Sequence, residues 1–286
     1  MALSALIKER IITMIELSEA IPFADKANTV LKNHYVKTVE VLNAPHKFAW
    51  LNHHPDEYHK RLTNRQIKEV KASSHYIRFI FDDSNEIAIG EDVVMKYGIT
   101  NSIDPKSQLL LHFSNGYSLS FKIKLYGFIF LGTEEELIKS EPYYAKAVNA
   151  VSPLSDEFTY DYFKERTNIS SDKGSLKQAL ATEQHIPGLG NGLLQDVLFD
   201  SGYSPKRKLS TLNEADRLKI YQSVKTKIKE IVLLGGRDLQ SDMLDTPGGY
   251  ETLMTTSRQT CPKCHGNLIK EAYLGGKVIY CPSCQK

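Results

Sequence analysis

Cysteine is absent from the first 260 residues of this 286-residue chain, and all four cysteines lie between Cys261 and Cys284. A disulfide framework therefore cannot support the main body of the protein, whose fold must depend on a hydrophobic core. Four cysteines clustered at one end favour a metal site in a reducing compartment over a set of disulfides.

Long apolar runs are missing too, because no segment approaches the roughly 20 apolar residues that a membrane-spanning helix needs. The first residues, MALSALIKERIIT, lack the apolar core and small-residue cleavage site of a secretion signal. With 41% hydrophobic and 24% charged residues, the composition is that of a soluble globular protein. We therefore expect a cytoplasmic, nucleoid-associated protein with no membrane partner.

A large excess of charge of one sign is also missing, since the formal net charge is only +2. Residues 1–200 carry 22 Lys and Arg against 26 Asp and Glu, a net charge of −4. Residues 201–286 carry 14 against 8, a net charge of +6. The overall charge is no argument for nucleic-acid binding, but the C-terminal third is the basic part of the chain.

Short β-branched and aromatic runs such as VKTVEVL, HYIRFIF and YSLSFKIKLYGFIFL dominate residues 15–131 and predict an antiparallel β domain. Asn115-Gly116 separates two alternating runs and predicts a hairpin, because both residue types tolerate positive φ. A helix over residues 19–34 is expected to pack beside the sheet.

The pattern changes near Pro142 and Pro153, and apolar residues three and four apart follow. This spacing predicts three helices, around residues 176–180, 193–198 and 218–232, the last with Asn213 as its N-cap and Gly235-Gly236 at its end. The domain boundary is placed here, and the chain is predicted to be an α+β protein.

The final segment holds two Cys-x-x-Cys pairs separated by 16 residues, a spacing at which four thiolates can surround one Zn²⁺. The residues between them alternate around Gly275-Gly276 and predict a hairpin, too small to fold without its metal. A redox pair is the alternative, but two pairs favour structural zinc, with His265 as a bystander. The predicted metal ligands are Cys261, Cys264, Cys281 and Cys284.

A glycine-rich turn, IPGLGNG, joins the first two helical patterns. Its glycines would let a ligand approach the backbone closely, and the amides that open the next helix suit a phosphate. A tight helix–helix turn is the alternative. Lys206, Arg207 and Lys208 follow and could neutralise neighbouring phosphates, although a solvated loop would have the same composition.

A helix, a glycine-asparagine turn, a second helix and a terminal four-cysteine hairpin, in this order, resemble the formamidopyrimidine-DNA glycosylase/endonuclease VIII family. The matching residues are IPGLGNGLLQDVLFDSGYSPKR and CPKC…YCPSCQK. The resemblance implies an N-terminal β-sandwich, a cleft for damaged double-stranded DNA, base flipping, and glycosylase and strand-cleaving lyase activity on oxidised bases. We also expect a monomer without a nucleotide cofactor. The residues expected to contact DNA are Gly190, Asn191, Gly192, Lys206, Arg207 and Lys277.

The same resemblance divides the chain into four parts after residues 1–13, which are either a leader or a misassigned start. Residues 14–135 would form the β-sandwich, catalytic-type domain and residues 136–155 a linker. Residues 156–250 would form the helix-two-turn-helix DNA-binding domain, and residues 251–286 the zinc finger.

Near the N terminus, MIELSEA (residues 14–20) is similar to the family's M-P-E-L-P-E start and places Glu16 at the catalytic glutamate position. In the family, Met is removed and the proline nitrogen attacks the sugar C1′ to form a Schiff base. An α-amino group suits this step because its pKa is near 8, against about 10.4 for Lys. Here Ile15 stands at the proline position and has no free amine.

Three explanations for Ile15 stay open. Translation starting at Met14 would leave an amine one residue away. A lysine could replace the proline, or the protein could bind lesions or abasic sites without cutting the strand. The candidate lysines are Lys47, Lys71, Lys96, Lys122 and Lys124. A zinc-ribbon accessory protein without lesion preference is a rival from another class.

Other positions also depart from the family pattern. His75 replaces a lysine before a tyrosine, and KIKLYG (residues 122–127) loses an arginine that helps fill the gap behind a flipped base. Gly276 replaces an arginine of the finger, with Lys277 beside it. Lys277 can contact phosphate but lacks the bidentate fork of arginine.

Two further residues have two interpretations each. Met95 is either a void-filling methionine or, the favoured reading, a core residue. Trp50, the only tryptophan, lies in PHKFAW and is either part of a base-contacting loop or a buried anchor.

Overall fold

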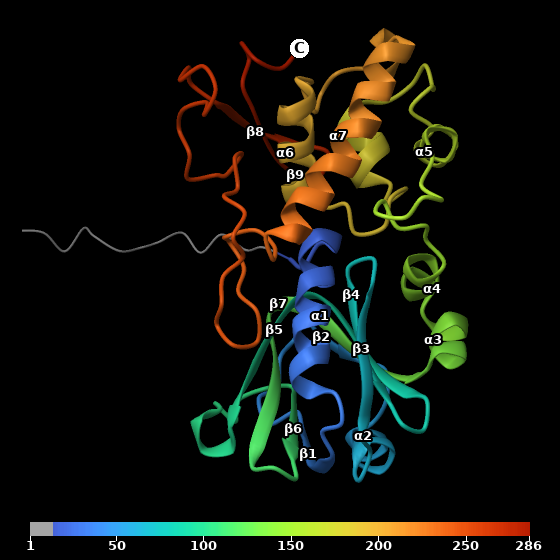
Figure 1. The fold of residues 1–286 in the computed structure, drawn as a ribbon, viewed down its shortest axis with the longest axis vertical. Coiled ribbons are helices and arrows are strands. Elements are labelled where there is room, and N and C mark those ends of the chain that lie inside the picture. The colour runs from blue at the N-terminus through green and yellow to red at the C-terminus, as the bar shows by residue number, and fades with distance from the viewer. Residues whose placement is uncertain (1–13) are drawn as a thin grey trace, which may run out of the picture.

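A computed structural model of the chain describes residues 14–286. Figure 1 shows two halves, one built around a β-sheet and one around helices, with the C-terminal hairpin beside the helices. Residues 1–13, the leader or misassigned start, lie outside the described residues.

The elements of the sheet half are α1 (Leu17–Leu31), β1 (Val36–Val41), β2 (Ala49–Leu51), α2 (Pro55–Leu62), β3 (Ile67–Ser73), β4 (Tyr76–Phe81), β5 (Asn85–Ile99), η1 (Thr100–Ser102), β6 (Leu109–Phe113) and β7 (Tyr117–Thr133). The elements that follow are α3 (Glu134–Ser140), α4 (Pro142–Val148), α5 (Tyr160–Thr167), η2 (Gln178–Thr182), α6 (Asn191–Ser201), η3 (Leu209–Thr211), α7 (Glu214–Leu233), β8 (Ile269–Tyr273) and β9 (Gly276–Tyr280). The predicted α+β class is confirmed.

The sheet runs in the order β1-β6-β7-β5-β4-β3, and neighbours on this path pair antiparallel, as predicted. The short strand β2 is an exception, because it pairs parallel to β7 with Trp50 opposite Phe128. The register of β5 against β7 shifts between Glu91 and Val93. A bulge of this kind bends the long strands locally, here beside the N-terminal segment.

The predicted hairpin between β6 and β7 is present, but its turn differs from the expected asparagine-glycine pair. Residues 114–116 connect the strands, and His112 faces Ser118 across them. Gly116 has φ of +84°, whereas Asn115 accepts the Tyr117 amide with its side chain at 3.1 Å. Only the glycine therefore uses the left-handed conformation.

Helix α1 connects the two halves. Glu16 is its N-cap and forms a capping box with Glu19. A stripe of small residues and leucine, Ala20, Ala24, Ala27 and Leu31, is buried in the core of the sheet half. Leu17, at the start of the helix, belongs instead to the core of the helical half.

Helices α6 and α7 contribute most of the second core, which includes Leu194, Leu198, Val224 and Ile228. Asn213 caps α7 as predicted, since its side chain accepts the Asp216 amide at 2.9 Å. The helix expected around residues 176–180 is present, but most of it is the π-helical segment η2. Its buried residues, Ala179 and Leu180, explain the helical spacing.

Most of the predicted linker, residues 136–155, is occupied by α3 and α4. Tyr144 of α4 is buried against Tyr76 of β4, so these helices pack against the outside of the sheet. The domain limits themselves stay a prediction. Within residues 14–286, every helix is too short or too polar to cross a bilayer.

Candidate functional site

The Glu16 carboxylate lies at the N-terminus of α6. Its Oε1 accepts a hydrogen bond from the Gly192 amide at 2.9 Å, and its Oε2 accepts one from the Leu193 amide at 2.8 Å. A helix N-terminus favours an anion, and here the anion belongs to the protein itself. The Gly192 and Leu193 amides, which the sequence suggested for a phosphate, are thus occupied by Glu16 in this structure.

Arg237, just beyond α7, is buried beside this carboxylate. It donates two hydrogen bonds to Glu19, at 2.7 and 2.8 Å, and lies 3.6 Å from a Glu16 oxygen. Burial raises the pKa of Glu16 above its ordinary value, and Glu19 adds to the rise, while Arg237 and the two amides oppose it. The second glutamate of MIELSEA signalled Glu19, but nothing in the sequence pattern indicated Arg237.

The glycines of the turn are required by the packing of the two halves. A Cβ on Gly190 would lie 2.5 Å from Glu16 Oε1, and a Cβ on Gly192 would lie 2.1 Å from Arg237 Nη1. Gly188 has φ of +78°, and its carbonyl accepts the Leu17 amide at 2.9 Å. The turn thus closes tightly around the start of α1, which neither of the two earlier interpretations anticipated.

A pocket of about 360 Å³ opens beside Glu16. This volume is within the range of small-ligand sites. The pocket is rich in aromatic rings and is lined by Met14, Ile15, Glu16, His75, Tyr76, Glu91, Tyr126, Phe128, Phe130, Glu141, Tyr143, Gln184, Gly188 and Gly190. Aromatic walls and three carboxylates, those of Glu16, Glu91 and Glu141, suit a flat ligand with a polar reacting atom.

The segment before Glu16 is held in place at three points. The Ile15 amide donates to the Glu91 carbonyl at 3.1 Å, and the Met14 carbonyl accepts from Gln240 Nε2 at 2.7 Å. The Tyr126 hydroxyl lies 2.6 Å from Met14 Sδ. Because the Ile15 nitrogen is a peptide nitrogen, its lone pair is delocalised and cannot attack a sugar.

A second pocket, of about 540 Å³, borders the other side of Ile15. Of the five candidate lysines, Lys96 and Lys124 line this pocket. Burial lowers the pKa of Lys96, and the charge of Lys124 lowers it further. Lys96 also forms an ion pair with Asp245.

The glycine-asparagine turn contacts the C-terminal hairpin directly. Asn191 Nδ2 donates to the Lys277 carbonyl at 2.6 Å, while the Lys277 side chain is exposed. Lys206 pairs with Glu271 of β8 at 3.0 Å, and Arg207 pairs with Asp216 at 3.3 Å. The structure thus brings Asn191, Lys206 and Lys277 together around the hairpin. Arg207 is turned towards α7.

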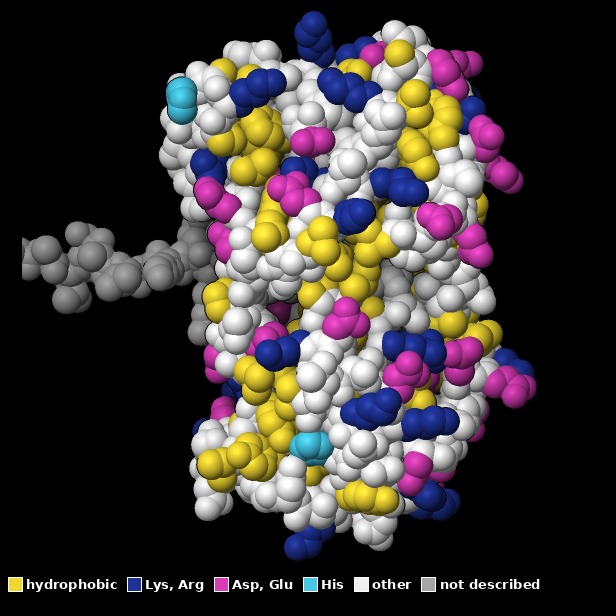
Figure 2. Space-filling model, in the orientation of Figure 1, with side chains coloured by type: hydrophobic (Ala, Val, Ile, Leu, Met, Phe, Trp, Pro, Cys, Tyr) yellow, Lys and Arg dark blue, Asp and Glu magenta, His cyan; other side chains and the backbone are white. Residues whose placement is uncertain are grey.

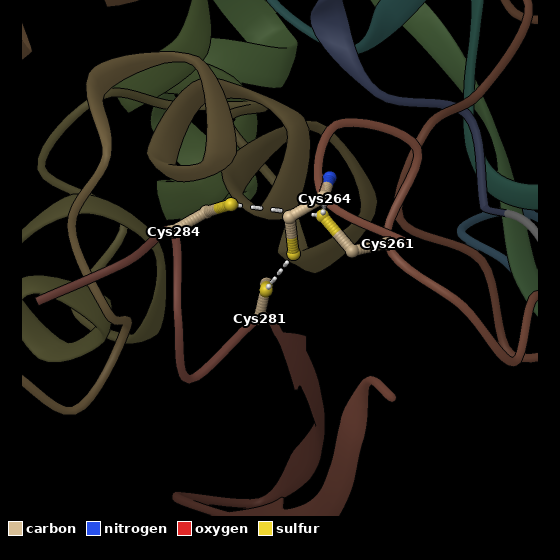
Figure 3. Close-up of side chains that lie close together, drawn as sticks. All are labelled: Cys261, Cys264, Cys281 and Cys284. Carbon is tan, nitrogen blue, oxygen red and sulfur yellow. Dashed lines mark hydrogen bonds between the residues drawn. The ribbon is translucent and has the colours of Figure 1, made fainter. Parts of the chain in front are cut away.

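The four cysteines form one cluster at the end of the hairpin (Figure 3). Their sulfur atoms all lie within 4.8 Å of one another. Tetrahedral ligands at Zn–S distances of about 2.3 Å lie about 3.8 Å apart, so this cluster can hold a metal ion. His265 is outside this group.

The turn between β8 and β9 is shifted by one residue from the expected Gly275-Gly276. Tyr273 faces Gly276 across the strands, and the turn residues are Leu274 and Gly275, with φ of +46° and +74°. This is the two-residue turn with positive φ at both positions.

The two residues with open interpretations, and also His75, are now placed. Met95 is buried in the sheet core, which confirms the packing interpretation. Trp50 is 52% exposed, so the buried-anchor interpretation is wrong. His75 lines the pocket beside Glu16, and burial lowers its pKa to about 4, which leaves it neutral at pH 7.

Comparisons with known proteins agree on one family. No protein-family model matches the chain. The formamidopyrimidine-DNA glycosylase of Carboxydothermus hydrogenoformans is 25% identical over 250 residues, which cover 81% of this chain and 85% of that protein. The Fpg of Lactococcus lactis in complex with DNA that contains an abasic site has a TM-score of 0.81 at 19% identity, with 95% of this chain and 99% of that chain covered. The complex of Lactococcus lactis Fpg with DNA containing N7-benzyl-Fapy-dG has a TM-score of 0.82 at 19% identity and the same coverage.

The relatives named as glycosylases match most of the chain, and the solved Fpg structures share its fold from the sheet to the cysteine hairpin. These similarities agree with the motifs at residues 14–20, 186–207 and 261–286. In sequence over most of its length, and in fold, the chain is therefore similar to proteins of the formamidopyrimidine-DNA glycosylase/endonuclease VIII family.

Proposed function

We propose that this protein is a base-excision repair enzyme, a DNA glycosylase and abasic-site lyase that acts on oxidised bases in duplex DNA. The observation that carries the proposal is the Glu16 carboxylate, fixed at the N-terminus of α6 and facing an aromatic pocket. The family relatives are glycosylases by name, and the solved neighbours hold lesion-containing DNA. Extruding a base costs a few kcal/mol, and a damaged pair lowers that cost.

Glu16 is suited to move protons at the sugar ring. Its raised pKa keeps a larger fraction protonated than for an exposed glutamate, so it can donate to the ring oxygen. In the proposed reaction an amine forms a bond to C1′ as the bond from C1′ to the base breaks, and the base leaves with the electron pair and takes up a proton. The ring oxygen then leaves C1′ with the proton from Glu16, the nitrogen loses its protons, and an imine remains.

DNA contacts are proposed for Asn191, Lys277 and Lys206, and Gly190 and Gly192 beside them, which have no side chains, would let the DNA approach the backbone closely. The side-chain amide of Asn191 has two hydrogens, and only one is needed for the Lys277 carbonyl. The other can donate to a phosphate. The exposed Lys277 and the half-exposed Lys206 add positive charge at the same place, as an electrostatic DNA contact requires. Arg207, already paired with Asp216, is proposed as a weaker contact.

The metal is proposed to be a single structural Zn²⁺ held by all four cysteines. Four thiolates leave no open position for a substrate, so its role is to fold the hairpin that carries Lys277. The zinc supplies no chemistry to the reaction.

The amine has three structural candidates. If the chain were processed to begin at Met14, its amine would lie at the pocket that contains Glu16. Lys96 and Lys124 lie in the neighbouring pocket, which also borders Ile15. The peptide nitrogen of Ile15 favours a second candidate function, a protein that binds lesions or abasic sites without cleavage.

Borohydride trapping tests the proposal. The protein would be incubated with duplexes that contain 8-oxoguanine, an oxidised pyrimidine or an abasic site, each with and without borohydride. A covalent adduct is expected, and peptide mapping should place it on Met14, Lys96 or Lys124. Lesion-selective binding without an adduct would support the second candidate, whereas equal binding to damaged and intact duplexes would overturn both.

A further inference from the structure

Exposed aromatic rings gather along one edge of the sheet, where β2 pairs with β7. Phe48 is 48% exposed, Trp50 is 52% exposed and Tyr126 is 36% exposed. The Trp50 and Tyr126 rings meet edge to face with centroids 6.4 Å apart. Lys47 Nζ lies 5.4 Å from the centre of the Phe48 ring. We call Phe48, Trp50 and Tyr126 the aromatic edge.

Backbone pairing holds the aromatic edge in place. The Gly127 amide donates to the Phe48 carbonyl at 3.1 Å, and Trp50 faces Phe128 in the parallel pairing of β2 with β7. Exposed rings on a fixed strand differ from scattered surface residues, because clustered apolar area of this kind marks a contact site. The lysine beside the rings indicates a partner with negative charge as well as flat apolar surface.

The aromatic edge is continuous with the pocket beside Glu16. Tyr126 belongs to both, because it lines that pocket while it contacts Trp50. Its hydroxyl also contacts Met14, two residues before Glu16. The Tyr126 ring therefore connects Trp50 to the pocket in which the reaction is proposed.

We propose that Trp50 stacks on a base of the DNA bound at this site, with Phe48 beside it and Lys47 near a phosphate. The inference rests on the proposed function, since it assigns a base contact to the same DNA. Extruding a nucleotide leaves neighbouring bases unstacked, and an aromatic ring can replace the lost stacking. Every base has a flat face, so the contact stabilises the opened duplex without reading its sequence.

Because Trp50 is the only tryptophan, its fluorescence reports on this position alone. The intact protein would be titrated with a duplex that carries a tetrahydrofuran abasic-site analogue, and binding would be followed in parallel by gel shift. Trp50 emission is expected to be quenched at the same DNA concentrations that shift the protein, and acrylamide should reach the indole less easily in the complex.

Three variants complete the test. Trp50→Ala should weaken binding of the same duplex by about fivefold to a hundredfold, the range of base–aromatic stacking, whereas Trp50→Phe should restore most of the affinity. Tyr35→Ala removes a similarly exposed ring, one that the proposal does not place at the DNA, and should bind as the wild type does. Thermal melting and zinc content of each variant check that the fold is intact.

The outcomes separate the two proposals. Lesion-selective binding in the gel with unchanged emission and a fully active Trp50→Ala variant would overturn the stacking inference and leave the repair function standing. Absence of DNA binding by the wild-type protein would overturn both.

Discussion

The side chain of Asn191 donates a hydrogen bond to the backbone carbonyl of Lys277 over 2.6 Å. One residue opens α6 and the other lies in β9, so this bond joins the glycine turn to the cysteine hairpin. The position of a polar residue at the start of α6 therefore depends on the hairpin that carries the cysteine cluster, which is proposed to need a metal to fold. The proposed catalytic and DNA-binding residues meet here, because Glu16 binds the amide of Gly192, the residue that follows Asn191.

Removal of the metal should therefore weaken DNA binding without affecting the sheet. Chelation, or Cys264→Ser, is expected to unfold the hairpin and lower the affinity for an abasic-site duplex at least about tenfold, since the hairpin has no core of its own. Metal content and gel shift measure the two effects. His265→Ala is the matched control, because His265 lies outside the cysteine cluster. Metal-free protein that binds DNA normally would contradict this view of the hairpin.

Glu16→Gln should slow base release by about 10²- to 10⁴-fold, the usual contribution of a general acid, while the affinity for DNA changes little. The wild-type rate should fall as pH rises through the raised pKa of Glu16, because the proton donor is lost. Glu16→Gln should lose this pH dependence of the rate. If Glu16 had only a structural role, the variant would keep it. Single-turnover rates across pH provide the measurement, with the half-exposed Glu57→Gln as control.

Much of the fold follows from local sequence patterns. The sheet, α1, α7 with its Asn213 cap, and the cysteine cluster were all predicted, because each depends on residues close together in the chain. The turns were predicted less accurately. The turn expected at residues 115–116 is one residue longer, and the turn expected at residues 275–276 lies one residue earlier. Strand register depends on side-chain packing across the pair, which a turn motif alone does not specify.

The site could be predicted only in part. Glu16, Asn191 and the four cysteines came from motifs, whereas Arg237 and the aromatic edge depend on contacts between distant segments. Glu19 and Arg237 are 218 positions apart. The glycine turn resembles a phosphate site in sequence, but in the structure the amides of Gly192 and Leu193 donate hydrogen bonds to Glu16. A single sequence does not reveal which anion occupies a helix N-terminus.

Gly190→Ala should destabilise the protein and its active site together. The new Cβ would lie 2.5 Å from Glu16 Oε1, so the carboxylate or the turn must move. Forced overpacking of this kind costs about 1–3 kcal/mol. Denaturant unfolding measures the loss, and Gly266→Ala is the control, because its Cβ would meet only Cys264 Sγ at an ordinary 3.5 Å. An equally stable, fully active Gly190→Ala variant would show that the turn has more room than the structure indicates.

His75 should make the protein less stable in mild acid. Its pKa is lowered to about 4 by burial, whereas in the unfolded chain it is near 6.5. Between these values the unfolded state binds the extra proton, so this contribution to stability is complete above about pH 6.5 and is lost as pH falls towards 4. The full effect is up to about 3 kcal/mol.

The matched variant for this prediction is His75→Gln, which keeps a polar side chain but cannot titrate. Glu16 contributes with the opposite sign, because its pKa is raised and its burial becomes costlier as pH rises. The difference between wild type and variant isolates His75 from that background. Denaturant unfolding at pH 5 and pH 7.5 should therefore show a larger loss in acid for the wild type than for His75→Gln, and equal losses would mean that His75 is protonated in the folded protein, beside Glu91 at 3.9 Å.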